Sequence, residues 1–167
     1  GVEAQSETVW RQADRYGVPR LCLINKMDKL GADFDYSFKS IRARLGANAI
    51  AIQIPIGFGN DFKGIIDLMT MKALYWKTEE QGQEIIEKEI PDDLKDTAEV
   101  WRSEMVEKIC ELDDSLTEKF LTDPATITVD ELKASLRKGV ITLKCFPVLC
   151  GSALKYVGVQ KILDSVI

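Results

Sequence analysis

The 167-residue chain contains no histidine, and this absence excludes several kinds of active site. Ser-His-Asp and Cys-His nucleophiles need an imidazole base, and the usual zinc sites combine histidine with cysteine. The four cysteines form no C-x-x-C pair, so we expect buried thiols in a reducing cytosol, with two disulfides as the alternative. Any chemistry must therefore come from carboxylates, amides, lysines and backbone groups.

The chain also lacks a long apolar run and a basic net charge. No run approaches the ~20 apolar residues that a membrane-spanning helix needs, and no signal-peptide pattern opens the chain. The net charge of -5 argues against general binding to nucleic acid or to an anionic membrane, since both select for a basic surface. We therefore expect a cytoplasmic protein with no membrane and no DNA partner, while docking on a ribosome through a local patch stays compatible.

Residues near the two ends of the chain share one pattern. An amphipathic segment precedes the short apolar run Leu21–Ile24, and a polar turn and a second amphipathic segment ending at Gly46 follow it. Phe146–Cys150 is again typical of a buried strand, followed by a loop and an amphipathic segment. Such alternation is typical of a doubly wound α/β fold. We therefore predict an α/β domain, with parallel strands and flanking helices, formed by residues 1–46 and 144–167.

The intervening residues 47–143 follow a different pattern. Several short β-like runs, beginning with 49–56, predict a small antiparallel or mixed sheet. Longer amphipathic segments come next, and one of them starts at Thr128 and Glu131, which have capping-box spacing. We therefore predict an α+β subdomain inserted into the α/β domain.

The first candidate site is the polar turn Asn25-Lys26-Met27-Asp28, which directly follows a predicted strand. In open α/β sheets, ligands bind at the carboxyl ends of strands. The Asp28 carboxylate can accept two parallel hydrogen bonds from the ring N–H and the exocyclic amine of guanine, and adenine offers no such pair of donors. The aliphatic part of Lys26 can lie over a purine face, and Asn25 can tie neighbouring loops together. The alternative is an ordinary polar turn between a strand and a helix.

The second candidate site is the loop 150–155. Ala153 is small enough for its backbone N–H to approach the O6 atom of a purine, which rejects the amine of adenine, and Ser152 can brace the loop. Gly-Ser-Ala is common in loops, so this site is weak evidence by itself. Because both loops follow apolar runs and precede amphipathic segments, together they favour a guanine-nucleotide site. Its expected members are Asn25, Lys26, Asp28, Ser152, Ala153 and Leu154.

Over essentially its whole length, the sequence resembles bacterial elongation factor G, the ribosomal translocase. Asn25–Asp28 resembles the family's fourth G motif, and Cys150–Ala153 resembles its fifth G motif. Gln5–Gln12 resembles the helix just beyond the second switch region, and Gly64–Leu68, with Met71–Ala73 and Trp76, resembles the start of the inserted G′ subdomain. Leu45–Asn48 and Gly158–Gln160 resemble the stretches that follow the two G motifs. The long separation of the two G motifs also resembles the G′ insertion. The resemblance implies part of a P-loop-type GTPase G domain, with the G′ subdomain at 47–143.

The resemblance further implies a GTP or GDP ligand and a parent protein that hydrolyses GTP during tRNA–mRNA translocation. Nothing in the chain matches the P-loop pattern G-x-x-x-x-G-K-[ST]. The segments that hold the phosphates and Mg²⁺ should precede Gly1. We therefore expect a fragment that has no catalytic residue and no metal ligand, binds GTP or GDP weakly and does not hydrolyse GTP. We also expect an uncovered strand edge, through which the fragment self-associates.

Partners on the ribosome are implied as well. The G′ subdomain of the family contacts the stalk protein of the large subunit, and the full-length factor contacts ribosomal RNA. The segment 92–114 carries an acidic face, which is either a solvated surface or a contact for basic residues of the stalk. The expected contact residues are Glu104, Glu107 and Glu111.

Two other interpretations remain open. One is a translational GTPase of the ribosome-protection type, which resembles elongation factor G in the G motifs. The other is an interaction module that binds no nucleotide, in which both loops are structural and a substitution at Asp28 changes only stability.

Overall fold

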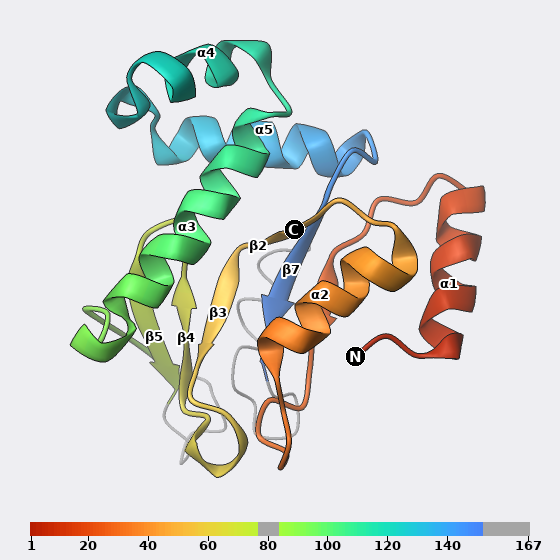
Figure 1. Ribbon diagram of the computed structural model, residues 1–167, viewed down its shortest axis with the longest axis vertical. Helices are drawn as coiled ribbons and strands as arrows, with labels where there is room; N and C mark the ends of the chain where they lie inside the picture. Colours follow the sequence, from red (N-terminus) through yellow and green to blue (C-terminus); the bar gives the residue numbers. More distant parts are fainter. Residues whose placement is uncertain (77–83, 152–167) are drawn as a thin grey trace.

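The computed structural model describes residues 1–76 and 84–151, which form two β-sheets with helices packed around them (Figure 1). In chain order, the helices and strands are α1 (Ala4–Arg15), β1 (Cys22–Ile24), α2 (Phe34–Leu45), β2 (Ala49–Ala51), β3 (Gln53–Ile56), β4 (Gly64–Asp67), β5 (Lys72–Trp76), β6 (Ile85–Lys88), α3 (Lys95–Cys110), α4 (Asp114–Thr122), α5 (Val129–Ile141) and β7 (Phe146–Cys150).

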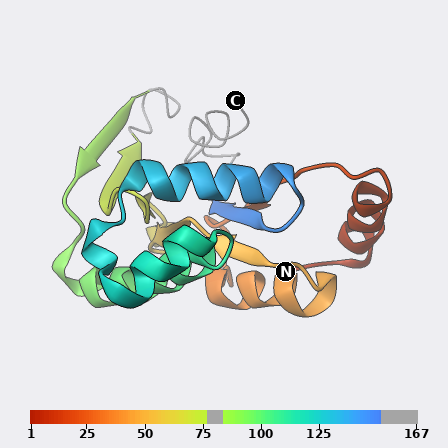
Figure 2. The same cartoon turned by 90° about the horizontal axis from the view of Figure 1, so that it is seen from above.

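The first sheet is parallel and has the strand order β1-β7-β2. Every residue of β7 is buried, as expected for the central strand of a sheet that is covered on both faces. Helices α2 and α3 lie on one face of this sheet, and α5 lies on the other (Figure 2). The predicted α/β fold with parallel strands and flanking helices is therefore confirmed.

The second sheet is antiparallel and has the strand order β3-β4-β5-β6. The sequence pattern predicts one continuous run over 49–56 inside the inserted segment, but the chain changes sheets at Ile52. The N–H of Ile52 still donates to the carbonyl oxygen of Val148 in β7, at 3.1 Å. Because β2 thus pairs within the parallel sheet, the antiparallel sheet starts later than residue 47. The division into residues 1–46 with 144–167 and an inserted subdomain 47–143 remains a proposal.

Local signals define the ends of the helices. α5 begins with a capping box, in which Glu131 N donates to Thr128 Oγ1 at 3.1 Å and Thr128 N donates to Glu131 Oε1 at 3.2 Å. This geometry confirms the start predicted from the spacing. α2 is capped by Asp33 and ends at Gly46, whose φ of 62° is the left-handed conformation that glycine adopts at little cost.

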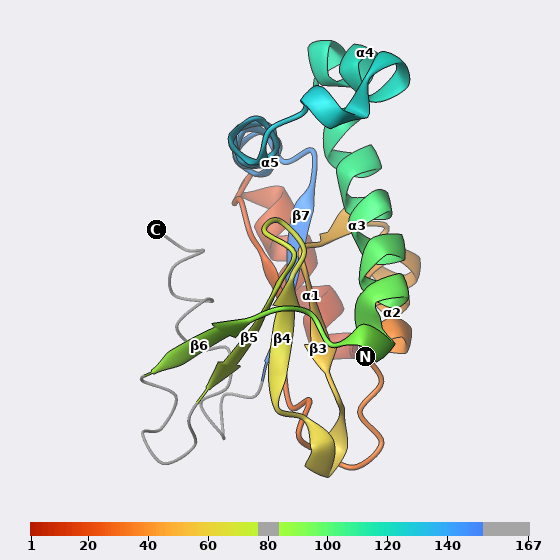
Figure 3. The same ribbon diagram turned by 90° about the vertical axis from the view of Figure 1, so that its left-hand side faces the viewer.

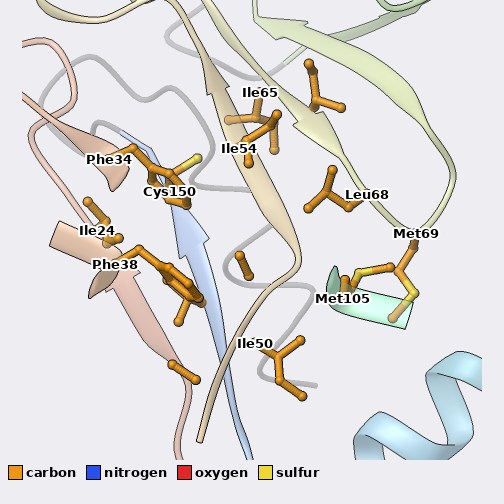
Figure 4. Close-up of a cluster of buried hydrophobic side chains, with 14 of the residues drawn as sticks. Ile24, Phe34, Phe38, Ile50, Ile54, Ile65, Leu68, Met69, Met105 and Cys150 are labelled. Carbon is orange, nitrogen blue, oxygen red and sulfur yellow. The ribbon is translucent and has the colours of Figure 1, made fainter. Parts of the chain in front are cut away.

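One continuous core joins the two sheets. Figure 4 shows Ile24 and Phe38 on the side of the parallel sheet, and Ile54 and Ile65 on the side of the antiparallel sheet. Because these apolar side chains pack into the same cluster, the antiparallel sheet is held in place against the parallel one.

The helices at the margins are less embedded. None of the residues of α1 is buried, and Figures 1 and 2 show this helix at the edge of the molecule. Arg20 attaches it, because its guanidinium lies 4.4 Å from the ring centroid of Trp10 and 4.9 Å from that of Phe146. At the other extreme, α4 lies far from both sheets (Figure 3).

No helix in the described part of the chain is long and apolar enough to cross a membrane.

Candidate functional site

The two candidate loops start at the same edge of the parallel sheet. β1 and β7 are parallel neighbours, and their last residues, Ile24 and Cys150, stand opposite each other in register. The N–H of Gly151 donates to the carbonyl oxygen of Ile24 at 3.1 Å, so the pairing continues into the first residue beyond β7. The loops that follow the two strands therefore begin side by side, at the carboxyl edge where open α/β sheets bind their ligands.

Met27 is the anchor of the first loop. Its side chain is 1% exposed. Its N–H donates to the carbonyl oxygen of Gly151 at 3.2 Å, and its carbonyl oxygen accepts from the N–H of Gly59 at 2.9 Å. Both of its backbone groups are thus bonded, one to the second candidate loop and the other to the loop between β3 and β4.

The residues around this anchor differ in exposure. Asn25 and Lys26 are exposed, whereas Asp28 is 6% exposed. Lys26 has a φ of 59°, an uncommon conformation for a residue other than glycine. The structure thus brings Asn25, Lys26 and Asp28 together in one tightly held turn. Of the second candidate loop, Cys150 and Gly151 are described, and Ser152, Ala153 and Leu154 lie outside the described residues.

Two residues near the site were not predicted from the sequence. Gln53, at the start of β3, is 5% exposed, and its Oε1 accepts from the N–H of Cys150 at 3.2 Å. Gly59 is the second, through its bond to Met27. The sequence does signal a turn-rich loop at 57–61, but no local pattern indicates which residues it contacts.

A groove of about 890 Å³ borders the site on the side of β1. It is lined by α1, β1 and α2, and it reaches Asn25, Lys26 and Met27. Within the described part of the chain, β1 pairs with β7 on one side and with no strand on the other. The groove is therefore lined in part by an unpaired strand edge, which is a surface suited to polypeptide.

The cysteines are not arranged for chemistry. Burial raises the pKa of Cys22 to about 11, although the Arg20 guanidinium opposes the rise. Burial alone raises the pKa of Cys145 to about 11 and also raises that of Cys150. These thiols stay protonated at neutral pH, which makes them poor nucleophiles and poor metal ligands. In residues 1–76 and 84–151, no three His, Cys, Asp or Glu side chains are grouped to hold a metal ion.

The acidic residues of α3 and its C-cap residue Glu111 have different surroundings. The Glu104 carboxylate accepts a hydrogen bond from Arg42 of α2 at 2.7 Å. Glu107 and Glu111 are exposed, and Glu111 lies 3.8 Å from the ammonium of Lys108. Glu104 is therefore engaged within the molecule, and the other two carboxylates face solvent.

Comparison with known proteins places the chain in a family. The family model of the elongation factor Tu GTP-binding domain matches residues 1–167. The structure is also similar to that of a protein from Thermus thermophilus, with a TM-score of 0.86 and 28% sequence identity. That match covers 99% of this chain and 24% of the Thermus protein, so the chain spans about a quarter of its relative's length. The chain therefore belongs to the family of the elongation factor Tu GTP-binding domain, a family of translational GTPases that bind guanine nucleotides.

Proposed function

We propose that this chain is the guanine-recognising part of a ribosome-dependent GTPase that catalyses tRNA–mRNA translocation. The observation that carries the proposal is the junction at Met27, where the turn that contains Asp28 is bonded to the start of the loop after β7. The family match supports guanine-nucleotide binding. The resemblance of the G motifs and of the inserted segment to elongation factor G supports the translocase role.

In this proposal each side chain has one task at the base. The Asp28 carboxylate accepts two hydrogen bonds from guanine, and the aliphatic part of Lys26 covers one face of the ring. Asn25 ties the neighbouring loops together. Ser152, Ala153 and Leu154 complete the site from the loop after β7, where a backbone N–H meets the O6 atom of guanine. These groups select the base, and they bring no phosphate ligand.

The phosphates and Mg²⁺ need residues that this chain does not supply in recognisable form. We propose that a segment with the P-loop and switch motifs packs along the groove beside β1 in the complete protein. Because most of the affinity for a nucleotide comes from its phosphates, residues 1–167 alone should bind GTP or GDP with a dissociation constant on the order of millimolar or weaker. Without the water-positioning and metal-binding segments, they should not hydrolyse GTP. A submicromolar dissociation constant for GDP would contradict this view.

Replacement of Asp28 by Asn tests the proposal directly. Asparagine presents an amide donor where the 2-position of xanthine offers a carbonyl, so the Asp28→Asn variant of the complete protein should prefer XTP to GTP in ribosome-stimulated turnover. The matched control is Asp35→Asn, the same change at an exposed position of α2. That variant should keep the preference for GTP. If Asp28→Asn also keeps it, Asp28 does not recognise the base.

Two alternatives make different predictions. A factor of the ribosome-protection type would show the same switch to XTP, but it would not support translocation. An interaction module without a nucleotide would show altered stability in Asp28→Asn and no change in nucleotide preference.

We also propose that the acidic face of α3 contacts the stalk protein of the large ribosomal subunit. Glu107 and Glu111 are exposed and available for basic residues of that partner. Glu104 contributes less, because its carboxylate already binds Arg42. Contacts of the complete factor with ribosomal RNA belong to the same proposal.

A further inference from the structure

We propose that the β3–β4 loop, residues 57–63, is a positioning element of the guanine site and sets both its affinity and its discrimination between bases. The inference rests on the proposed function, because it concerns the same site. Figure 1 shows this loop and the β1–α2 loop at the same end of the molecule, the lower end in that view. The loop connects two strands of the antiparallel sheet. Through it, the inserted part of the chain would act on nucleotide binding directly.

A backbone hydrogen bond links the β3–β4 loop to Met27. The N–H of Gly59 donates to the carbonyl oxygen of Met27 at 2.9 Å, and both residues are buried. The N–H of Met27 is held from the other side by Gly151. These two bonds fix the peptide units on either side of Met27, which are the units that join it to Lys26 and Asp28. The direction of both base-recognising side chains therefore depends on the two bonds.

The conformation of Lys26 makes this support necessary. Its φ of 59° lies in a region that residues other than glycine rarely occupy. Such a conformation persists where the surroundings hold it. Release of the bond from Gly59 would remove one of the two restraints on Met27, and the turn could relax toward ordinary backbone angles.

The β3–β4 loop has a shape that only glycine permits at residue 57. Gly57 has a φ of 77°, and a Cβ atom there would lie 2.1 Å from the carbonyl oxygen of Asp61. The loop closes through bonds from Lys63 N to Ile56 O at 3.0 Å and from Phe62 N to Gly59 O at 3.2 Å. A side chain at residue 57 must therefore displace the loop backbone, and the Gly59 N–H with it.

Base discrimination provides a readout that simple loss of stability would not change. Guanine offers Asp28 two donors, while hypoxanthine lacks the exocyclic amine and offers one. A well-positioned carboxylate therefore prefers GDP to IDP. A carboxylate that has lost its position binds both bases less well and loses the advantage of the second hydrogen bond.

The test compares Gly57→Ala with Gly46→Ala in the complete protein. Both changes put a Cβ atom at positive φ, but Gly46 ends α2 and its added Cβ would have no neighbour within 4 Å. Dissociation constants for GDP and IDP are measured at a temperature where both variants are folded. We expect Gly57→Ala to weaken GDP binding about tenfold, the order expected for one charge-assisted hydrogen bond, and to bring the IDP/GDP ratio of dissociation constants toward one. Gly46→Ala should keep the unaltered ratio.

A folded Gly57→Ala variant with the ratio of the unaltered protein would overturn the positioning role. If the unaltered protein itself does not distinguish GDP from IDP, the proposed function fails and this inference fails with it. Hydrogen exchange at the Gly59 amide covers the case in which Gly57→Ala does not fold. In the unaltered protein, GDP should slow that exchange, and an unchanged rate at saturating GDP would also overturn the inference.

Discussion

At the residue scale, the side chain of Gln53 accepts a hydrogen bond from β7 that a neighbouring strand would otherwise accept. β2 pairs with β7 as far as Ala51 opposite Val148, and the chain then leaves the parallel sheet. Beyond that point the backbone N–H of Cys150 would lack an acceptor from β2, and the buried Gln53 side chain supplies one at 3.2 Å. One amide thus completes the hydrogen bonding of β7 just before the second candidate loop.

We expect the Gln53→Met variant to lose about 1–3 kcal/mol of unfolding free energy, because it leaves the buried N–H of Cys150 without an acceptor. Methionine has a similar length and keeps the packing. Urea denaturation measures the loss as a lower midpoint with an unchanged m-value. The control is Gln12→Met at an exposed position of α1. Equal midpoints for the two variants would show that the Gln53 bond contributes nothing.

Residue positions were predictable from the sequence only where they depend on neighbours in the chain. Asn25 and Asp28 lie in a polar turn directly after an apolar run, so their place at a strand end follows from local pattern. Gln53 lies 97 positions from its partner Cys150. Its polar side chain is buried through a contact that no spacing rule encodes, and the same holds for the bond between Gly59 and Met27.

At the scale of elements, α3 packs against α2, the helix that follows the turn Asn25–Asp28. Trp101 makes edge-to-face contacts with Phe34 and Phe38 of α2, at centroid distances of 5.4 and 5.3 Å. Arg42 of α2 bonds to Glu104 of α3 at 2.7 Å. One face of α3 is therefore occupied by α2, and the exposed acidic residues lie outside that contact.

Charge reversal on this exposed face tests the proposed stalk contact. The Glu107→Lys, Glu111→Lys double variant of the complete protein should slow ribosome-stimulated GTP turnover severalfold at low salt, because complementary charge mainly raises association rates. The control pair is Glu118→Lys with Asp130→Lys, which makes the same change in net charge at exposed positions of α4 and α5. Equal turnover for both double variants would show that the acidic face of α3 does not contact the stalk protein.

Periodicity was sufficient to predict most elements, and it failed at one border. The inner positions of α3 repeat along the helix, and Ala98, Met105 and Ile109 are buried as that pattern indicates. The predicted run 49–56 is apolar apart from Gln53 and Pro55, and it contains no turn signal at the point where the chain changes sheets. The hydrogen bond of Ile52 to β7 determines that border, and it depends on a strand far along the chain.

For the molecule as a whole, β1 is an edge strand that pairs with β7 on one side and with no described strand on the other. The groove of about 890 Å³ lies along that edge, between α1 and α2. Successive residues of a strand direct their backbone groups to opposite sides. Because the carbonyl oxygen of Ile24 accepts from the N–H of Gly151, just beyond β7, the N–H and carbonyl of Leu23 face the unpaired edge. This edge is a template for another strand.

We therefore predict that residues 1–167 alone pair with a second copy through the edge of β1. In sedimentation velocity, their average mass should rise with concentration, despite the net charge of -5. Leu23→Pro removes the donor that faces the edge and leaves the bonds of Ile24 to β7, so it should lower the association. Circular dichroism would establish that this variant keeps its fold. The complete protein, in which we propose that the groove is filled, should stay monomeric at the same concentrations. A monomeric chain 1–167 at high concentration would show that this edge does not recruit a second copy.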